Sequence, residues 1–306
     1  MKRAPNTVFL VNPASDNGAT GRRWPEIAHV AAERGLEGAT LFSERPNHFT
    51  ELVAQAVANG AERVVAVGGD GTLNEVANGL LALPGEPPEL AVIPFGTGMD
   101  FARSHGIPRT LEAAIDVARD GRTATIDAGR VSFTAWDGSD GEAYFANIAS
   151  AGMSGAVARQ ANQTSKALGG RISFFAALVR VFARWKNTEL EVDAGGEHRS
   201  GKMTNLIVAN GRYQGGGMLI APEALADDGL FDVLVIGDIT KRDFVLNVGK
   251  IYRGTHLSHP KIELLRSASV SVDAEVPVPI ELDGEQPGTT PARFEVVPAA
   301  LRLRVP

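Results

Sequence analysis

Three polar or glycine-rich segments of this sequence each follow a run of apolar residues that predicts a buried strand. They are residues 12–18 (Asn-Pro-Ala-Ser-Asp-Asn-Gly), 68–72 (Gly-Gly-Asp-Gly-Thr) and 94–100 (Pro-Phe-Gly-Thr-Gly-Met-Asp). The carboxyl ends of parallel strands lie at one edge of a sheet, where α/β proteins place their ligands. We therefore expect the three segments to converge on one site.

Residues 68–72 have the composition of an anion-binding loop. Glycines let phosphate oxygens approach backbone amides, and the helix expected to follow supplies unpaired N–H groups at its start. Asp70 would repel a bare phosphate, but it suits a site in which Mg²⁺ lies between the carboxylate and the phosphates. The alternative is a tight turn in which Asp70 only caps the helix. The same two interpretations apply to residues 96–100, with Asp100 in place of Asp70.

Several well-known nucleotide and hydrolase motifs are absent from the sequence. There is no GxxxxGK[ST] phosphate loop and no GxSxG nucleophile motif, and Val11, which ends the first predicted strand, is followed by Asn-Pro and not by GxGxxG. The chain is therefore not expected to be a P-loop enzyme, an α/β-hydrolase or a dinucleotide-dependent oxidoreductase.

The composition limits the classes of protein further. The chain has 306 residues, a net charge of -6 and no cysteine, which excludes disulfide scaffolds, thiolate metal sites and cysteine nucleophiles. The acidic balance argues against nucleic acid as a partner, because duplex binding depends on lysine and arginine. No apolar run approaches the ~20 residues that span a bilayer, and the stretch before Thr7 is too short for a signal peptide. We therefore expect a cytoplasmic protein without a transmembrane segment.

The pattern of apolar residues divides the chain into two parts near residue 128. In the first part, predicted strands at 8–11, 40–42, 63–67 and 90–93 alternate with predicted helices at 24–34, 51–58, 73–83 and 110–119, which is typical of a parallel α/β sheet. In the second part, short β runs separated by turn residues predict an antiparallel sandwich with a helical insert at about 170–185. The β runs lie at 131–133, 144–148, 190–192, 205–209, 231–236, 262–265, 270–272 and 293–297.

Two acidic turns in the second part allow two interpretations each. Residues 227–230 (Asp-Asp-Gly-Leu) could hold a divalent ion, and residues 283–285 (Asp-Gly-Glu) could take a proton from a hydroxyl. Asp-Gly is also a common hairpin turn. The spacing alone favours hairpins at both places.

Several motifs, taken together, resemble the diacylglycerol kinase catalytic domain. They are residues 68–79 (GGDGTLNEVANG), 94–103 (PFGTGMDFAR), 215–218 (GGGM), 222–224 (PEA), 228–229 (DG), 259–261 (HPK) and 283–285 (DGE). These motifs extend along most of the chain, and the group they resemble most is the bacterial lipid kinases that phosphorylate diacylglycerol and related lipids. As a set they are specific for the family but only weakly specific for the substrate.

The resemblance implies a fold and an activity. The fold is an α/β N-terminal domain with a parallel sheet, of the NAD kinase/diacylglycerol kinase-like type, joined to a larger β-sandwich domain with a helical insert. The implied domains are residues 1–128 for ATP and 129–291 for the lipid, and residues 292–306 return to the first domain. The implied activity is transfer of the γ-phosphate of ATP to the hydroxyl of a lipid such as diacylglycerol, with Mg²⁺ as cofactor. The lipid would be met at the inner face of the membrane, and a homodimer is consistent with the family.

The resemblance also assigns roles to individual residues. Asp70 and Asp100 match carboxylates that work with the catalytic magnesium, while Glu285 matches the proton acceptor, with Asp283 beside it. Asp228 and the carbonyl groups of Leu225 and Leu230 match a second, structural magnesium site. The residues that match ATP contacts are Asn12, Pro13, Ala14, Ser15, Asp16, Ser43, Gly69, Asp70, Gly71, Thr72, Leu73, Asn74, Glu75 and Thr97.

Two residues depart from the family pattern. Met99 stands where the family usually has asparagine, and methionine has no amide to offer near the nucleotide. Asp16 stands where glycine is usual and brings a negative charge to a phosphate loop. These departures keep a catalytically degenerate, lipid-binding regulatory protein open as an alternative, beside a NAD- or sugar-type kinase of the same fold.

Residues 171–185 are the expected contact with lipid. At helical spacing Arg180 and Arg184 share one face, and aromatic and aliphatic residues fill the rest. One interpretation is an interfacial helix or groove wall that holds anionic headgroups. The other, which the composition favours, is a helix packed on the sandwich with its arginines reaching solvent. The apolar character of this segment also favours a lipid over a polar acceptor such as NAD or a sugar.

Overall fold

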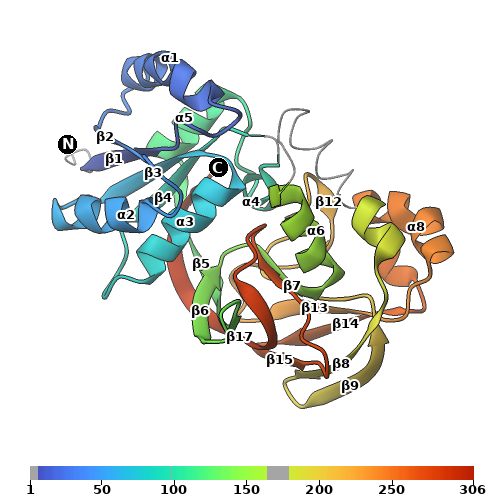
Figure 1. Ribbon diagram of the computed structural model, residues 1–306. Helices are drawn as coiled ribbons and strands as arrows, with labels where there is room; N and C mark the ends of the chain where they lie inside the picture. Colours follow the sequence, from blue (N-terminus) through green and yellow to red (C-terminus); the bar gives the residue numbers. More distant parts are fainter. Residues whose placement is uncertain (1–5, 97, 164–178) are drawn as a thin grey trace. The chain divides into compact units, whose positions relative to one another are not determined.

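The computed structural model of the chain describes residues 6–96, 98–163 and 179–306. The chain forms two units: unit 1 contains Met1–Ile126 and Ala299–Pro306, and unit 2 contains Asp127–Pro298. The chain passes from one unit to the other within strand β5 (Arg122–Ala135) and within strand β17 (Gly288–Val305) (Figure 1).

Unit 1 is a parallel sheet covered by helices. Its strands β1 (Thr7–Val11), β2 (Ala39–Phe42), β3 (Arg63–Gly68) and β4 (Glu89–Pro94) pair in the order β2-β1-β3-β4. In β17, Leu303 pairs in parallel with Leu90 of β4. The helices are α1 (Ala19–Glu33), α2 (Phe49–Ala58), α3 (Asp70–Leu81), α4 (Asp100–Ser104) and α5 (Leu111–Asp120).

The central strands of unit 1, β1, β3 and β4, carry unbroken apolar runs after a polar first residue, as expected where helices cover both faces of a sheet. Side chains of one face, including Phe9, Val65 and Ile93, pack with Ile27 of α1 and Ile115 of α5. Helices α2 and α3 pack against each other, and both contact the sheet (Figure 1).

Two predicted helices begin earlier than expected. Helix α1 begins at Ala19 and not at Trp24, because Gly18, with φ 78°, ends the preceding loop and starts the helix directly. Helix α3 begins at Asp70 and not near Leu73. In both cases the first turn is polar or small and therefore carries none of the apolar periodicity from which the helix was predicted.

Unit 2 is a sandwich of two antiparallel sheets. One sheet has the order β14-β13-β10-β7-β16, and the other joins β17, β15, β8 and β9, with β5 pairing β17 and β6. The strands are β6 (Asp140–Phe145), β7 (Ile148–Gly152), β8 (Thr188–Ala194), β9 (Glu197–Met203), β10 (Asn205–Ala209), β13 (Phe231–Ile236), β14 (Ile262–Ser267), β15 (Ser269–Asp273) and β16 (Ile280–Leu282). The shared core contains Phe145, whose ring stacks on Phe231 at 5.4 Å and meets Phe294 edge-on at 6.3 Å.

Helices and a small hairpin complete unit 2. They are α6 (Met153–Gln163), the hairpin β11 (Tyr213–Gln214) and β12 (Met218–Leu219), helix α8 (Lys241–Arg253) and the 3-10 helix η2 (His256–Ser258). The predicted insert at 170–185 falls largely outside the described residues, of which 179–184 are helical. The predicted fold class, a parallel α/β domain joined to a β-sandwich, is confirmed. Within the described residues, no helix is both long enough and apolar enough to cross a membrane.

Candidate active site

The three loops predicted to carry chemistry meet at one edge of the sheet of unit 1. Strands β1, β3 and β4 are neighbours and run in parallel, so their carboxyl ends at Val11, Gly68 and Pro94 point the same way. Asn12 Nδ2 donates a hydrogen bond to Thr72 Oγ1 at 2.9 Å, which joins the first loop to the second. The Phe95 amide donates to the Gly68 carbonyl at 2.7 Å, which joins the third loop to the second.

The second loop requires glycine where it turns into α3. A Cβ atom at Gly68 would lie 2.4 Å from Thr72 Oγ1, so any larger residue would displace the Thr72 side chain and with it the contact to Asn12. Residues 70–72 begin α3, at the amino end where a helix offers backbone N–H groups that have no acceptor in a preceding turn, and the Leu73 amide is the first to donate back, to the Gly69 carbonyl at 3.1 Å. The segment therefore combines a close backbone approach with the amino end of a helix, as expected for an anion-binding loop.

Asp70 and Asp100 direct carboxylate oxygens toward the same place. A Cβ atom at Gly98 would lie 2.4 Å from Asp70 Oδ2 and 3.9 Å from Asp100 Oδ2, so the missing side chain leaves room for both oxygens. The other oxygen of each carboxylate is engaged: Asp70 Oδ1 accepts from the Phe101 amide at 3.2 Å, and Asp100 Oδ1 contacts Arg103 Nη1 at 2.5 Å. Carboxylate oxygens are the donor type that Mg²⁺ takes, and two of them converge here.

The first loop is shaped by its own side chains. Asn12 Oδ1 accepts from the Ala14 amide at 3.0 Å, and Ser15 Oγ donates to the Asn12 carbonyl at 2.9 Å. Asp16, Asn17 and Gly18 follow one another in the left-handed region, with φ of 51°, 54° and 78°. Their conformation turns the chain directly into α1.

Some of the predicted ATP contacts have other partners or lie elsewhere in the fold. Glu75 Oε2 accepts from the Phe49 amide at 3.4 Å, which places this carboxylate at the start of α2. The Leu73 side chain is buried in unit 1, so only its backbone faces the loop. Ser43 follows β2, and its amide donates to the Val11 carbonyl at 3.0 Å. Thr97 lies outside the described residues.

In unit 2, the two carboxylates of the predicted proton-acceptor turn have different surroundings. The oxygens of Asp283 accept hydrogen bonds from the amides of Ala146, Asn147 and Ile148 at 2.8, 3.0 and 2.9 Å. Leu282 and Glu285 exchange backbone hydrogen bonds across a two-residue turn in which Asp283 and Gly284 have φ of 50° and 93°. The Glu285 side chain is exposed. The hairpin and the chemical interpretation are thus compatible, since the hairpin presents Glu285.

A buried glutamate beside this turn was not predicted. Glu281 is 3% exposed, and its carboxylate accepts hydrogen bonds from Ser150 Oγ at 2.9 Å and from Gln214 Nε2 at 2.7 Å. Burial raises the pKa of Glu281 to about 8, and the charge of Asp283 adds to this rise. The sequence does contain a signal for this burial, because Glu281 is the one charged residue in the apolar run 278–282 (Val-Pro-Ile-Glu-Leu).

The predicted structural metal site has a protein cation nearby. The Asp228 carboxylate pairs with the Arg266 guanidinium, which also contacts Asp232 Oδ1 through Nε at 3.1 Å. The second Asp228 oxygen accepts from the Leu230 amide at 3.1 Å. Asp228 thus has an arginine beside it, as Asp100 has Arg103, and a metal ion held by Asp228 and the Leu225 and Leu230 carbonyls stays a prediction.

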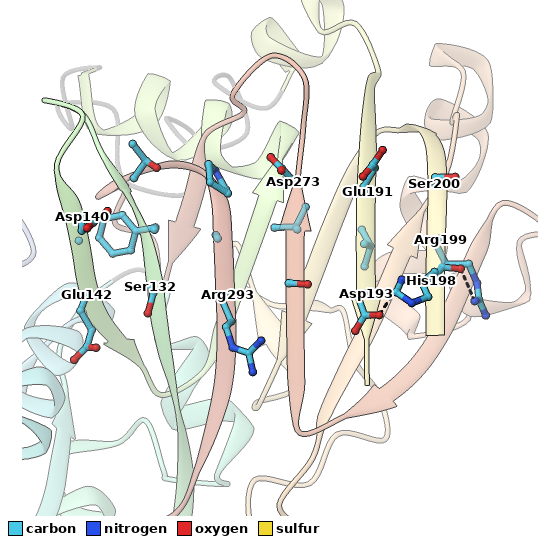
Figure 2. A pocket seen from close by; sticks show the side chains of 18 residues that line it. Ser132, Asp140, Glu142, Glu191, Asp193, His198, Arg199, Ser200, Asp273 and Arg293 are labelled. Carbon is cyan, nitrogen blue, oxygen red and sulfur yellow. Dashed lines mark hydrogen bonds and ion pairs between the residues drawn. The ribbon is translucent and has the colours of Figure 1, made fainter. Parts of the chain in front are cut away.

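A hollow of about 980 Å³ lies in unit 2 over the sheet that contains β8, β9 and β15. Figure 2 shows acidic side chains along it, among them Asp140, Glu142, Glu191 and Asp273. No predicted site residue lines it. Its acidic character would repel the phosphates of a nucleotide, so it is not the candidate site.

A smaller pocket has the opposite character. Its volume is about 110 Å³, and it lies between the β7-β10-β13 sheet and helix α8. Apolar side chains dominate its wall, and Gln214 lies among them. The apolar lining residues are Met153, Ile207, Met218, Ile220, Ile236, Ile239, Phe244, Ile251 and Ile262. A cavity of about 150 Å³ lined in this way takes up benzene, so this pocket suits a segment of hydrocarbon.

Two known domain families match consecutive parts of the chain. Residues 6–131 match the diacylglycerol kinase catalytic domain, and residues 147–305 match the YegS C-terminal NAD kinase beta sandwich-like domain. A diacylglycerol kinase of Mycobacterium tuberculosis is 30% identical over 299 residues, covering 97% of this chain and 94% of that protein. The chain belongs to the diacylglycerol kinase family.

Further comparisons agree with this family. A diacylglycerol kinase of Bacillus subtilis is 28% identical over 295 residues, covering 96% of this chain and 93% of the relative. A solved structure of a diacylglycerol kinase from Bacillus anthracis superposes with a TM-score of 0.76 at 20% identity, covering 100% of this chain and 98% of that one. Yeast NADH kinase complexed with NADH reaches a TM-score of 0.52 at 11% identity, over 99% and 83% of the two chains. These two structural likenesses concern the fold alone.

The family membership confirms the expected class of enzyme. This chain is a lipid kinase, and the kinase family implies ATP as its co-substrate.

Proposed function

We propose that this kinase transfers the γ-phosphate of ATP to the hydroxyl of diacylglycerol or a closely related lipid, with Mg²⁺ as cofactor. The observation that carries the proposal is the convergence of Asp70 and Asp100 beside Gly98, at the edge of the sheet where the three loops meet. Phosphoryl transfer depends mainly on positioning and on neutralising charge, and this edge offers both.

In this proposal unit 1 binds the nucleotide. The amino end of α3 and the backbone of residues 12–18 and 68–72 would receive the phosphates, as the family resemblance suggests. Asp70 and Asp100 would hold Mg²⁺, which supplies positive charge against the phosphate oxygens. Asn12 and Ser15 keep the loop in shape through their hydrogen bonds, and they act on the nucleotide through the backbone.

Glu285 is the residue that we propose takes the proton from the lipid hydroxyl. Asp283 already accepts three amide hydrogen bonds, which hold its carboxylate within the turn. Its role is to fix the turn. Glu285 lies two residues further along the same turn and is exposed, so its carboxylate can meet a substrate.

Unit 2 would bind the lipid. The pocket against α8 suits part of an acyl chain, because nine apolar side chains line it, although polar side chains such as Asn205, Gln214 and His256 line it too. This character favours a lipid acceptor over the polar acceptors of the related NAD- and sugar-type kinases. The outward face of α8 supports contact with a bilayer, because it exposes Val245 and Leu246 beside Arg242 and Lys250.

The test is transfer of radiolabelled phosphate from ATP to lipids in detergent micelles with Mg²⁺. The panel contains diacylglycerol, a monoacylglycerol, a sphingoid base and a polyprenol, and NAD and glucose serve as polar acceptors. We expect labelled diacylglycerol from the wild type and a loss of at least about a hundredfold in the Asp70→Asn variant. Asp137→Asn is the matched control, because Asp137 is an exposed carboxylate bonded only to Ser139 nearby.

Each other outcome has a distinct meaning. Labelled NAD or glucose without labelled lipid would overturn the lipid assignment. Transfer that survives Asp70→Asn would overturn the proposed magnesium site. If the Met99→Asn variant gives product and the wild type gives none, the natural chain is a catalytically degenerate kinase, the alternative raised by Met99 and Asp16.

A further inference from the structure

Glu281 occupies a position where a carboxyl group is costly. It lies on β16 directly opposite Ser150 of β7, and the two side chains are 3% and 0% exposed. Burying an ionisable group without a full charge partner costs stability, and an apolar residue would fill this place more cheaply. A function for Glu281 therefore has to be sought in what it contacts.

The contacts of Glu281 lead to the turn that carries Glu285. Glu281 Oε1 accepts a hydrogen bond from the Gly284 amide at 2.5 Å. Its other oxygen accepts from Ser150 Oγ at 2.9 Å and from Gln214 Nε2 at 2.7 Å. Ser150 is fixed in the centre of the sheet, since β7 pairs with both β10 and β16.

The turn is thus held from two sides. Asp283 fixes one side through the amides at the start of β7, and Glu281 fixes the other side through the Gly284 amide. Gly284 is the residue immediately before Glu285, so movement of its peptide group would redirect the Glu285 side chain. Gln214, a second donor to Glu281, also lines the apolar pocket.

We propose that Glu281 is a positioning residue for phosphoryl transfer: it holds the Gly284 peptide and so aims Glu285, with Ser150 and Gln214 holding Glu281 in turn. This inference rests on the proposed role of Glu285 as proton acceptor. It adds a residue that touches neither ATP nor the lipid hydroxyl, and it links the turn to the wall of the apolar pocket.

The test compares Glu281→Leu with Glu281→Gln. The leucine removes the acceptor for all three donors, whereas the glutamine carbonyl keeps an acceptor for the Gly284 amide. We expect Glu281→Leu to lower kcat about tenfold with the KM for ATP unchanged, because a small displacement of a catalytic group is enough for such a loss. Glu281→Gln should stay within about threefold of the wild type, since it preserves the essential hydrogen bond.

Hydrogen–deuterium exchange gives a second readout that does not depend on activity. The Gly284 amide should exchange faster in Glu281→Leu than in the wild type, and Glu281→Gln should restore its protection. If Glu281→Leu does not fold, Gln214→Leu removes one of the supporting donors and should change kcat and exchange in the same direction by a smaller factor.

Glu285→Gln separates this inference from the function on which it rests. Full activity in Glu285→Gln would overturn the role of Glu285, whatever Glu281 does. A strong loss in Glu285→Gln, together with wild-type kcat or unchanged Gly284 exchange in Glu281→Leu, would overturn the positioning role alone.

Discussion

Asp283 and Glu285 lie two positions apart in one turn, yet their contacts give them different tasks. Three amides hold Asp283, whereas Glu285 faces solvent. Residue type therefore identifies candidates, and the exposure of each side chain distinguishes them, because a carboxylate must be accessible to meet a substrate.

Met99 is a residue in an unfavourable backbone conformation. It precedes α4 with φ 55° and ψ 40°, a left-handed conformation that asparagine adopts more easily than methionine. We expect Met99→Asn to raise the free energy of unfolding by about 1 kcal/mol relative to Met99→Ala, measured by urea denaturation. The alanine variant is the control, because both changes remove the methionine side chain. Equal free energies of unfolding in the two variants would show that the left-handed backbone conformation at residue 99 does not lower stability.

The buried carboxyl of Glu281 predicts a dependence of stability on pH. Burial raises its pKa from 4.5 to about 8 in the folded state. Between these values the unfolded chain has lost the proton and the folded chain keeps it, so stability falls as the pH rises. The fall can reach about 1.4 kcal/mol per pH unit.

Glu281→Gln removes this titration. The unfolding free energy of the variant minus that of the wild type should therefore increase from pH 5 to pH 8. Urea denaturation at four pH values measures it, and a constant difference across this range would contradict the raised pKa.

At the scale of elements, helix α8 has two unlike faces. Its inner face, with Phe244, Asn247 and Ile251, lines the apolar pocket. None of its residues is fully buried, and Val245, Leu246 and Tyr252 are 67%, 68% and 50% exposed. The net charge of -6 makes an anionic bilayer repel the protein as a whole. A locally basic helix can therefore decide which face of the protein turns toward the bilayer.

Vesicle sedimentation tests this face of α8. With vesicles containing anionic lipid, Arg242→Glu with Lys250→Glu should weaken binding at least tenfold, since each basic residue near such a surface contributes about 1 kcal/mol. Val245→Ser with Leu246→Ser should weaken binding to neutral vesicles as well. Val276→Ser is the matched control, because Val276 is 66% exposed but lies outside α8. If none of these changes weakens vesicle binding, the membrane contact does not lie on α8.

The elements also show which parts of the fold can be predicted from the sequence. The strands of unit 1 were predicted because their apolar runs are unbroken, and the loops after them because glycine and aspartate stand out at strand ends. Helix α8 was missed because its residues are mostly polar and unburied. Its one signal was the pair Thr240 and Asp243, which form a capping box. Glu281 was missed because its role depends on Ser150 and Gln214, which only the folded sheet brings near.

At the scale of the whole molecule, the end of β17 is part of unit 1. Leu301, Leu303 and Val305 are buried there, and Leu303 pairs with Leu90 of β4. Polar contacts support this return: Arg304 Nη1 donates to Thr123 Oγ1 at 3.1 Å and lies 3.5 Å from Glu89 Oε1. Arg304 donates to the Arg119 carbonyl at 2.9 Å.

Loss of Glu89 should destabilise unit 1. The Arg63 side chain is only 7% exposed, so Glu89→Ala would leave its charge buried without a carboxylate and with only the Arg119 carbonyl, at 3.2 Å, as an acceptor. We expect a loss of about 3–5 kcal/mol in the free energy of unfolding. Glu26→Ala is the control, because its pair with Arg23 in unit 1 is exposed, at 57% and 47%, and should contribute less than about 1 kcal/mol. Equal effects of the two changes would contradict the importance of the buried pair.

The place of Ala299–Pro306 in unit 1 also has a consequence for synthesis on the ribosome. Residues 127–298 are translated before this segment, so β4 remains the outer strand of its sheet while unit 2 emerges. An open strand edge can pair with other chains. The first 126 residues contain β1 to β4, but the edge of β4 stays open until residues 299–306 are made. The nascent protein is therefore expected to need protection by chaperones until translation is nearly finished.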